Sequence, residues 1–217
     1  VAVFAQALAL APDTVNALIG LGDAYRELRQ WERAETAYQQ AITLAPADAG
    51  IWLSLALLHD RSGQLEKAER AYRQALAMGT GRSLQDEVLL RAALASVCQR
   101  QGKLDLAAQE YEEALRFCSE EKLGAEFMST SAPELMSALA LIYVAQDRVD
   151  EALALTQQAL LRRPEYGFAH FLLGLACEKK GDKDKAIRAY EAAIRYSGTD
   201  QTLRQNAEAQ LSRLRQR

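Results

Sequence analysis

The chain has 217 residues, of which 49% are hydrophobic and 25% are charged, with a net charge of -3 at pH 7. This acidic balance argues against a nucleic-acid-binding array, which would carry a basic stripe. No stretch reaches the roughly 18 uninterrupted apolar residues of a membrane-spanning helix. The three cysteines are an odd number without paired spacing, which favours reduced thiols over a disulfide framework.

The most regular feature of the sequence is a period of 34 residues. A set of small and aromatic residues recurs at this distance: Ala34, Tyr38 and Ala41 recur as Ala68, Tyr72 and Ala75. A fixed period in this range predicts a stack of small helical units, each of which buries its apolar face against its neighbours.

The first complete repeat, residues 15–48, specifies two helices. Leu21 and Tyr25 are four residues apart, as are Ala34 and Tyr38, so each pair shares one helical face. Small residues on these faces let the two helices approach closely, and the tyrosines fill the space between them. The expected unit is therefore an antiparallel helix pair.

This pattern of Leu-Gly, Tyr, Ala, Tyr and Pro resembles the tetratricopeptide repeat. The resemblance covers nearly the whole chain and implies an all-α fold, a right-handed α-solenoid of stacked helix-turn-helix repeats. The expected organisation is residues 1–14, the second helix of a truncated repeat; 15–48, a repeat; 49–82, a repeat; 83–121, a repeat with a lengthened first helix; 122–132, an insertion loop; 133–166, a repeat; 167–200, a repeat; and 201–217, a C-terminal capping helix.

Two departures from the period locate insertions. Gly63 and Gly102 are 39 residues apart, which places extra residues around 79–83, and Ser83 is expected to cap the helix that follows. Ala107 and Ala152 are 45 residues apart, which places the longer insertion before residue 133. Residues 131–134, Ser-Ala-Pro-Glu, are expected to form a capping box with proline in the first turn.

The two ends differ in character. Residue 1 is Val rather than Met, and residues 1–11 supply only half a repeat, so we expect native sequence upstream. Residues 201–217 predict a polar helix with one apolar side, as in a terminal cap. The compartment stays open: a cytoplasmic location is favoured, and the missing upstream sequence has room for a membrane anchor.

The sequence predicts no enzymatic activity, no cofactor and no metal site. It contains no glycine-rich phosphate loop after a strand, no nucleophile elbow and no zinc-binding His pair. His59, Cys98 and Cys177 take the place that Tyr25 holds in the first repeat, so we expect them to be packing residues. Cys118 ends a helix beside the long insertion.

The predicted binding site follows from the resemblance. In tetratricopeptide repeat proteins the first helix of each repeat lines the concave surface. The apolar residues at the corresponding inward positions are Ile19, Leu53, Leu57, Leu89, Leu141, Val144, Phe168, Phe171 and Leu175. The C-terminal members are expected to be the main contact, unless Phe168 or Phe171 packs against an adjacent helix or the capping helix. The Lys, Asn and Arg clamp that binds chaperone tails is missing from these positions.

The leading hypothesis is a non-enzymatic scaffold or adaptor that binds a partner helix or an apolar peptide in the concave groove, in the assembly of a larger complex. An alternative is the targeting or regulatory module of a larger enzyme whose catalytic domain lies outside this sequence. A third is an array that self-associates. The amino-acid composition, rich in Ala, Leu, Gln and Arg, is compatible with a bacterial source.

Overall fold

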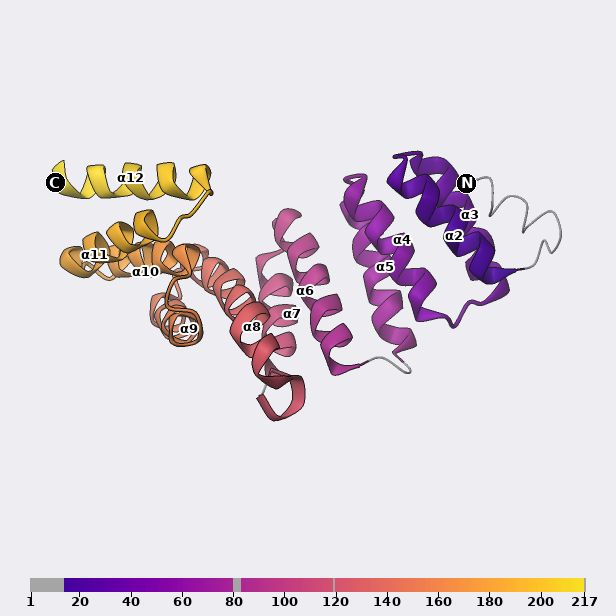
Figure 1. Cartoon of the computed structure of the whole chain (residues 1–217), viewed down its shortest axis with the longest axis horizontal. Coiled ribbons are helices and arrows are strands. Elements are labelled where there is room, and N and C mark those ends of the chain that lie inside the picture. Colours follow the sequence, from indigo (N-terminus) through magenta and orange to yellow (C-terminus); the bar gives the residue numbers. More distant parts are fainter. Residues whose placement is uncertain (1–13, 80–82, 119, 217) are drawn as a thin grey trace. The chain divides into compact units, whose positions relative to one another are not determined.

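The computed structural model describes residues 14–79, 83–118 and 120–216, and within them it contains eleven α-helices and no strand (Figure 1). The expected second helix of a truncated repeat and the centre of the first insertion, residues 1–13 and 80–82, lie outside the described residues. The helices are α2 (Val15–Glu27), α3 (Trp31–Leu44), α4 (Ala49–Arg61), α5 (Leu65–Met78), α6 (Leu84–Arg100), α7 (Leu104–Arg116), α8 (Glu120–Ala145), α9 (Val149–Arg162), α10 (Gly167–Lys179), α11 (Lys183–Arg195) and α12 (Gln201–Gln216).

The chain forms two compact units, Val1–Lys103 and Leu104–Arg217. In the first unit α2 packs against α3, and α4 packs against α5; α3 also contacts α4, and α5 contacts α6. In the second unit each helix from α7 to α12 packs against the next one along the chain. The predicted all-α fold of helix-turn-helix pairs is confirmed.

The recurring residues form the core of each helix pair. Tyr38 and Tyr190 are fully buried, and each ring lies against a glycine of the partner helix. A Cβ atom added at Gly22 would come within 2.5 Å of the Tyr38 ring, and one added at Gly174 would come equally close to Tyr190. The glycines are therefore the reason that the tyrosine rings fit between the helices.

Ser83 caps α6, as the sequence predicts. Its side-chain oxygen accepts a hydrogen bond from the backbone N–H of Asp86, and the Asp86 carboxylate accepts one from the backbone N–H of Ser83. This reciprocal pair satisfies two N–H groups that the first turn of the helix leaves without intrahelical partners.

The predicted insertion loop at residues 122–132 is wrong, because this segment is helical and continues into α8. Gly124, with φ of 77°, is the non-helical point, and the chain then runs as helix to Ala145. The extra residues after Gly124 lengthen the first helix of the repeat by about two turns. Phe127 and Met128 are buried, which explains why apolar residues occur here.

The predicted capping box at residues 131–134 is also wrong, because the helix is already continuous where it would begin. Pro133 lies inside α8 and is fully buried. By length and composition Lys122–Ala145 would suffice to cross a membrane, but 67% of its most apolar window is buried inside the protein. That burial is typical of a core helix, so its length and hydropathy are weak evidence for a membrane span.

The last helix covers the apolar end of the second unit. The residues that the sequence places on one side of α12 are buried: Leu203, Ala207, Leu211 and Leu214. Two of them, Leu211 and Leu214, join Cys177, Ala186 and Tyr190 in one cluster. The opposite side of α12 carries polar and charged residues that are exposed.

Candidate protein-binding surfaces

The first helices of successive pairs lie next to one another within each unit. In the first unit α2 contacts α4, and in the second unit α10 contacts both α8 and α12. We use the term first-helix face for the surface of these helices that carries the nine predicted groove residues, taken separately in each unit. The residues of this face come from corresponding positions of the repeats, so they recur on each first helix.

In the first unit the first-helix face keeps apolar side chains partly open to solvent. Ile19, Leu53 and Leu57 are half-buried, and Leu89 at the start of α6 is 47% exposed. None of these four residues belongs to the fully buried core of the unit. This part of the predicted site is therefore accessible.

The charged groups that α2 carries on this face are engaged internally. The Asp23 carboxylate accepts a hydrogen bond of 2.7 Å from the Tyr38 hydroxyl and lies 3.1 Å from Nη2 of Arg26. Burial, and then this hydrogen bond, raises the pKa of Tyr38, so the hydroxyl stays protonated and donates. Asp23 is thus held as part of the helix pair, which leaves mainly apolar surface for a partner.

In the second unit several predicted groove residues contribute to packing. The Phe171 ring lies 5.8 Å from the Tyr190 ring, and Phe171 and Leu175 both pack against the cluster that contains Leu211 of the capping helix. Val144 is only 7% exposed. The alternative considered for Phe171, packing against its neighbouring helices, is therefore what the structure contains.

Two predicted residues of the second unit keep accessible apolar surface and lie outside that cluster. Leu141 on α8 and Phe168 on α10 are both half-buried. The Phe168 ring has the Tyr166 ring as a neighbour, with centroids 6.3 Å apart and planes tilted by 59°. Phe171 and Leu175 are half-buried too, but they pack against the cluster around Cys177, so Leu141 and Phe168 are the better candidates for partner contact on this unit.

The tyrosines of the second helices differ in their hydrogen bonds. The Tyr190 hydroxyl donates to Glu178 at 3.1 Å, as Tyr38 donates to Asp23. The buried Tyr72 hydroxyl has no partner among the described residues. Asp60 precedes Tyr72 by the same distance as Glu178 precedes Tyr190, but the Asp60 carboxylate pairs with the Arg100 guanidinium.

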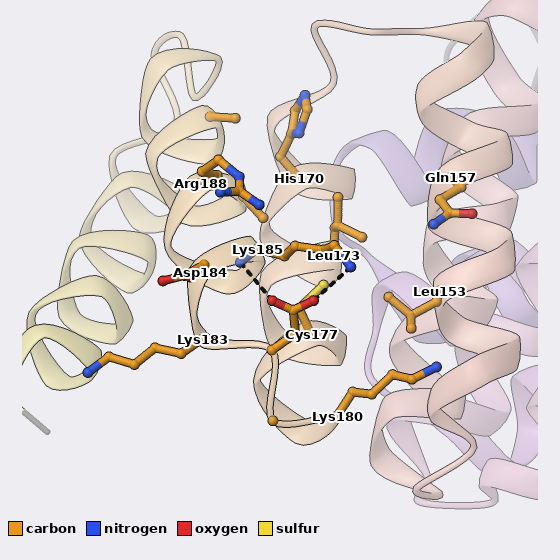
Figure 2. Close-up of a pocket in the computed structure, with 14 residues that line it drawn as sticks. Leu153, Gln157, His170, Leu173, Cys177, Lys180, Lys183, Asp184, Lys185 and Arg188 are labelled. Atoms are coloured by element: carbon orange, nitrogen blue, oxygen red, sulfur yellow. Dashed lines mark hydrogen bonds and ion pairs between the residues drawn. The ribbon is translucent and has the colours of Figure 1, made fainter.

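A second surface, which the sequence analysis missed, is a hollow between α9 and α11 with α10 as its floor (Figure 2). Its volume is about 1080 Å³. We call it the α9–α11 groove. The residues that define it are Leu153, Gln157, Leu173, Cys177, Lys185 and Arg188.

The histidines and cysteines have structural surroundings. His59 is buried, and burial lowers its pKa, while Nε2 of the ring lies 3.8 Å from the Glu35 carboxylate. The His170 ring stacks on the Tyr196 ring, with the two ring centroids 5.4 Å apart. Cys98 and Cys177 are buried, and burial raises the pKa of the Cys177 thiol. Across the described ranges, no three His, Cys, Asp or Glu residues are grouped so that they could hold a metal ion.

The sequence matches known repeat families over most of its length. A family model described as "Tetratricopeptide repeat" matches residues 53–121 and 137–213, and one described as "TPR repeat" matches residues 22–63. Among curated proteins none matches the sequence significantly.

Solved structures with the same fold cover most of the chain. YrrB, a TPR protein with an unusual peptide-binding site, superposes with a TM-score of 0.73 at 18% identity, over 95% of this chain and 97% of its own. MamA gives a TM-score of 0.71 at 18% identity, over 86% and 93%. BtubC from P. vanneervenii gives 0.71 at 23% identity, over 90% and 85%. At these identities the likeness establishes the fold.

Proposed function

This chain belongs to the tetratricopeptide repeat family, and from that membership we propose that it is a non-enzymatic scaffold or adaptor that binds another protein. The partner segment is an amphipathic helix or an apolar peptide, which lies on the first-helix face. The YrrB structure supports the proposal, because that protein has the same fold and a peptide-binding site.

The observation that carries the proposal is the row of apolar side chains left partly open on the first helices. Leu53 and Leu57 on α4, with Ile19 on α2, form it in the first unit. Leu141 and Phe168 form it in the second unit. Core packing leaves these side chains partly exposed, and apolar surface of this kind favours the apolar face of a partner helix.

The charges of the face support an apolar rather than an acidic ligand. Arg26, the cation on the inner side of α2, already contacts Asp23 at 3.1 Å and Glu27 at 3.6 Å. The Glu178 carboxylate on α10 accepts a hydrogen bond from the Tyr190 hydroxyl. An acidic tail would have to displace such internal contacts, whereas an apolar segment leaves them intact.

The test is a double substitution on the second unit, Leu141→Ser with Phe168→Ser. Buried anchors at an interface each contribute on the order of 2 kcal/mol, so retention of the natural partner in a pull-down from source-organism lysate should be lost. The matched control is Leu161→Ser, because Leu161 is 81% exposed on the second helix α9 and lies off the first-helix face.

Circular dichroism and thermal melting accompany the pull-down. We expect both variants to keep the wild-type helicity, and we expect the control to retain the partner. A folded double variant that retains the partner as well as the wild type would place the contact elsewhere and reject the proposal for this unit.

A further inference from the structure

Two helix trios of the chain are built from corresponding residues. In the first unit α4 lies with α3 and α5, and in the second unit α10 lies with α9 and α11. Corresponding positions in the two trios are 118 residues apart, as for Lys67 and Lys185 or for Leu55 and Leu173. Differences between the two trios therefore isolate what is particular to the α9–α11 groove.

In the first trio the chain supplies its own carboxylate between the second helices. Glu35 on α3 lies 3.1 Å from the Lys67 ammonium on α5 and 3.8 Å from the His59 ring on α4. The Glu35 side chain is only 23% exposed, so it fills the space between the three helices. The cation of α5 thus has an acidic partner from the preceding repeat.

In the second trio the position that corresponds to Glu35 has no carboxylate, although Asp182 and Asp184 line the groove near the start of α11. Leu153 corresponds to Glu35 and Cys177 corresponds to His59, whereas the cations Lys185 and Arg188 correspond to Lys67 and Arg70. The hollow at this place has a volume of about 1080 Å³. The cations of the second helix are kept, but the carboxylate that α3 supplies in the first trio has no counterpart at the corresponding position of α9.

The cations of the groove are only partly neutralised. Lys185 turns back to Asp182, 2.7 Å away at the start of its own helix, and Lys180 pairs with Asp150 at 2.5 Å. For Arg188 no ion pair is found within the described part of the chain. Figure 2 shows Arg188 and Lys185 on the α11 side of the hollow, with Gln157 and Leu153 facing them from α9.

We propose that the α9–α11 groove binds a segment of a partner protein that supplies the missing carboxylate, a Glu or Asp side chain flanked by apolar residues. The carboxylate takes the place that Glu35 occupies in the first unit. Arg188 donates paired N–H groups to it, Lys185 adds a second cation, and the Gln157 amide donates a hydrogen bond. Leu153 and Leu173 contact the apolar neighbours of the acidic residue.

This surface is separate from the first-helix face. Its walls are the second helices α9 and α11, and its ligand is acidic rather than apolar. The inference therefore stands without the proposed function, and the two sites are tested by different variants.

The test uses a displayed library of random 12-residue peptides, selected against the whole chain. The deciding variant is Leu153→Glu, which returns the internal carboxylate and should lower the affinity of the selected acidic peptides by at least about tenfold. Leu153→Gln is the matched control, since it has the same shape without the charge and should keep most of the affinity. Circular dichroism verifies that both variants fold.

A second variant guards against loss of packing at Leu153, which is partly buried against the cluster around Cys177. Arg188→Gln changes an exposed residue and should weaken the same peptides by about tenfold, whereas Arg195→Gln, at the last turn of α11 and outside the groove, should not.

The proposal is overturned by any of three results. The first is a selection in which no peptide distinguishes the wild type from Leu153→Glu. The second is a set of selected peptides that bind as tightly after Glu and Asp are replaced by Gln and Asn. The third is a wild-type chain that dimerises in sedimentation and that Leu153→Glu makes monomeric, which would make a second copy the occupant.

Discussion

At the scale of single residues, the contact between a glycine and a tyrosine ring determines how closely two helices approach. Gly22 has no room for a side chain, because an added Cβ would lie 2.5 to 2.8 Å from three atoms of the Tyr38 ring. The same ring holds the Asp23 carboxylate through its hydroxyl at 2.7 Å. The packing and the polar contact of this helix pair therefore depend on the absence of a side chain at residue 22.

Gly22→Ala is expected to destabilise the protein. Replacing glycine by alanine inside a helix normally stabilises it by up to about 1 kcal/mol, but here the methyl group must displace the Tyr38 ring, at a cost of about 1–3 kcal/mol. Urea unfolding followed by circular dichroism measures the difference. Gly50→Ala is the control, since the nearest atom to its added Cβ is the flexible Asp48 carboxylate at 3.1 Å. A Gly22→Ala variant that is more stable than the wild type would contradict this packing.

A second residue-scale feature is the buried neutral histidine of α4. Burial lowers the pKa of His59, the nearby Lys67 and Arg70 lower it further, and the Glu35 carboxylate opposes them. Nδ1 of the ring has no hydrogen-bond partner in the described residues. The folded protein therefore holds the neutral ring, whereas an unfolded chain takes up a proton near the ordinary value of about 6.5.

The sign of the pH dependence follows from that difference. Below about pH 6.5 the unfolded state binds more protons at this site than the folded state, so the free energy of unfolding falls as the pH falls. We expect this loss between about pH 7.5 and 5.5, and we expect His59→Gln to flatten it. Urea midpoints measured across this range provide the test. Equal slopes for the wild type and the variant would show that His59 does not carry the effect.

At the scale of elements, the sequence predicts the helix pairs well because their cores use a short-range pattern. Ala34, Tyr38 and Ala41 share one face, and the structure buries all three. The cap at Ser83 is equally local, since Asp86 lies within the same turn. The conformation of the extra residues before Pro133 was harder to predict, because the spacing between repeats gives the length of an insertion but not whether it is helical. The buried Phe127 and Met128 are the signal that could have indicated helix.

The candidate sites were predicted less completely than the fold. Repeat positions place Phe171 on an inward side, but only the structure brings its ring to within 5.8 Å of Tyr190. What distinguishes the α9–α11 groove is a missing charge, because Leu153 stands at the position that corresponds to Glu35. A search of the sequence for charged, nucleophilic or metal-binding side chains does not select a leucine. Comparing the repeats position by position against their own ion pairs would have revealed it.

At the scale of the whole molecule, many charged pairs join neighbouring repeats within each unit. Four of them link successive repeats of the first unit: Glu27–Arg61, Glu35–Lys67, Asp60–Arg100 and Glu69–Lys103. The second unit has Asp147–Lys179 and Asp150–Lys180, at 2.7 and 2.5 Å. Most of these side chains are well exposed, so each pair contributes only about 0–1 kcal/mol. Apolar packing between neighbours must therefore supply most of the stability.

This balance predicts a weak response to salt. At 1 M NaCl the screening length falls to about 3 Å, which removes most of the attraction of exposed pairs and leaves apolar packing in place. We expect the free energy of unfolding, from urea titrations at low salt and at 1 M NaCl, to fall by less than it does in Leu94→Ala. That variant empties a fully buried position of α6 and should lose about 2–5 kcal/mol. If 1 M NaCl lowered the free energy of unfolding by more than this truncation does, the ion pairs between repeats would stabilise each unit more than its Ala, Leu and Tyr core.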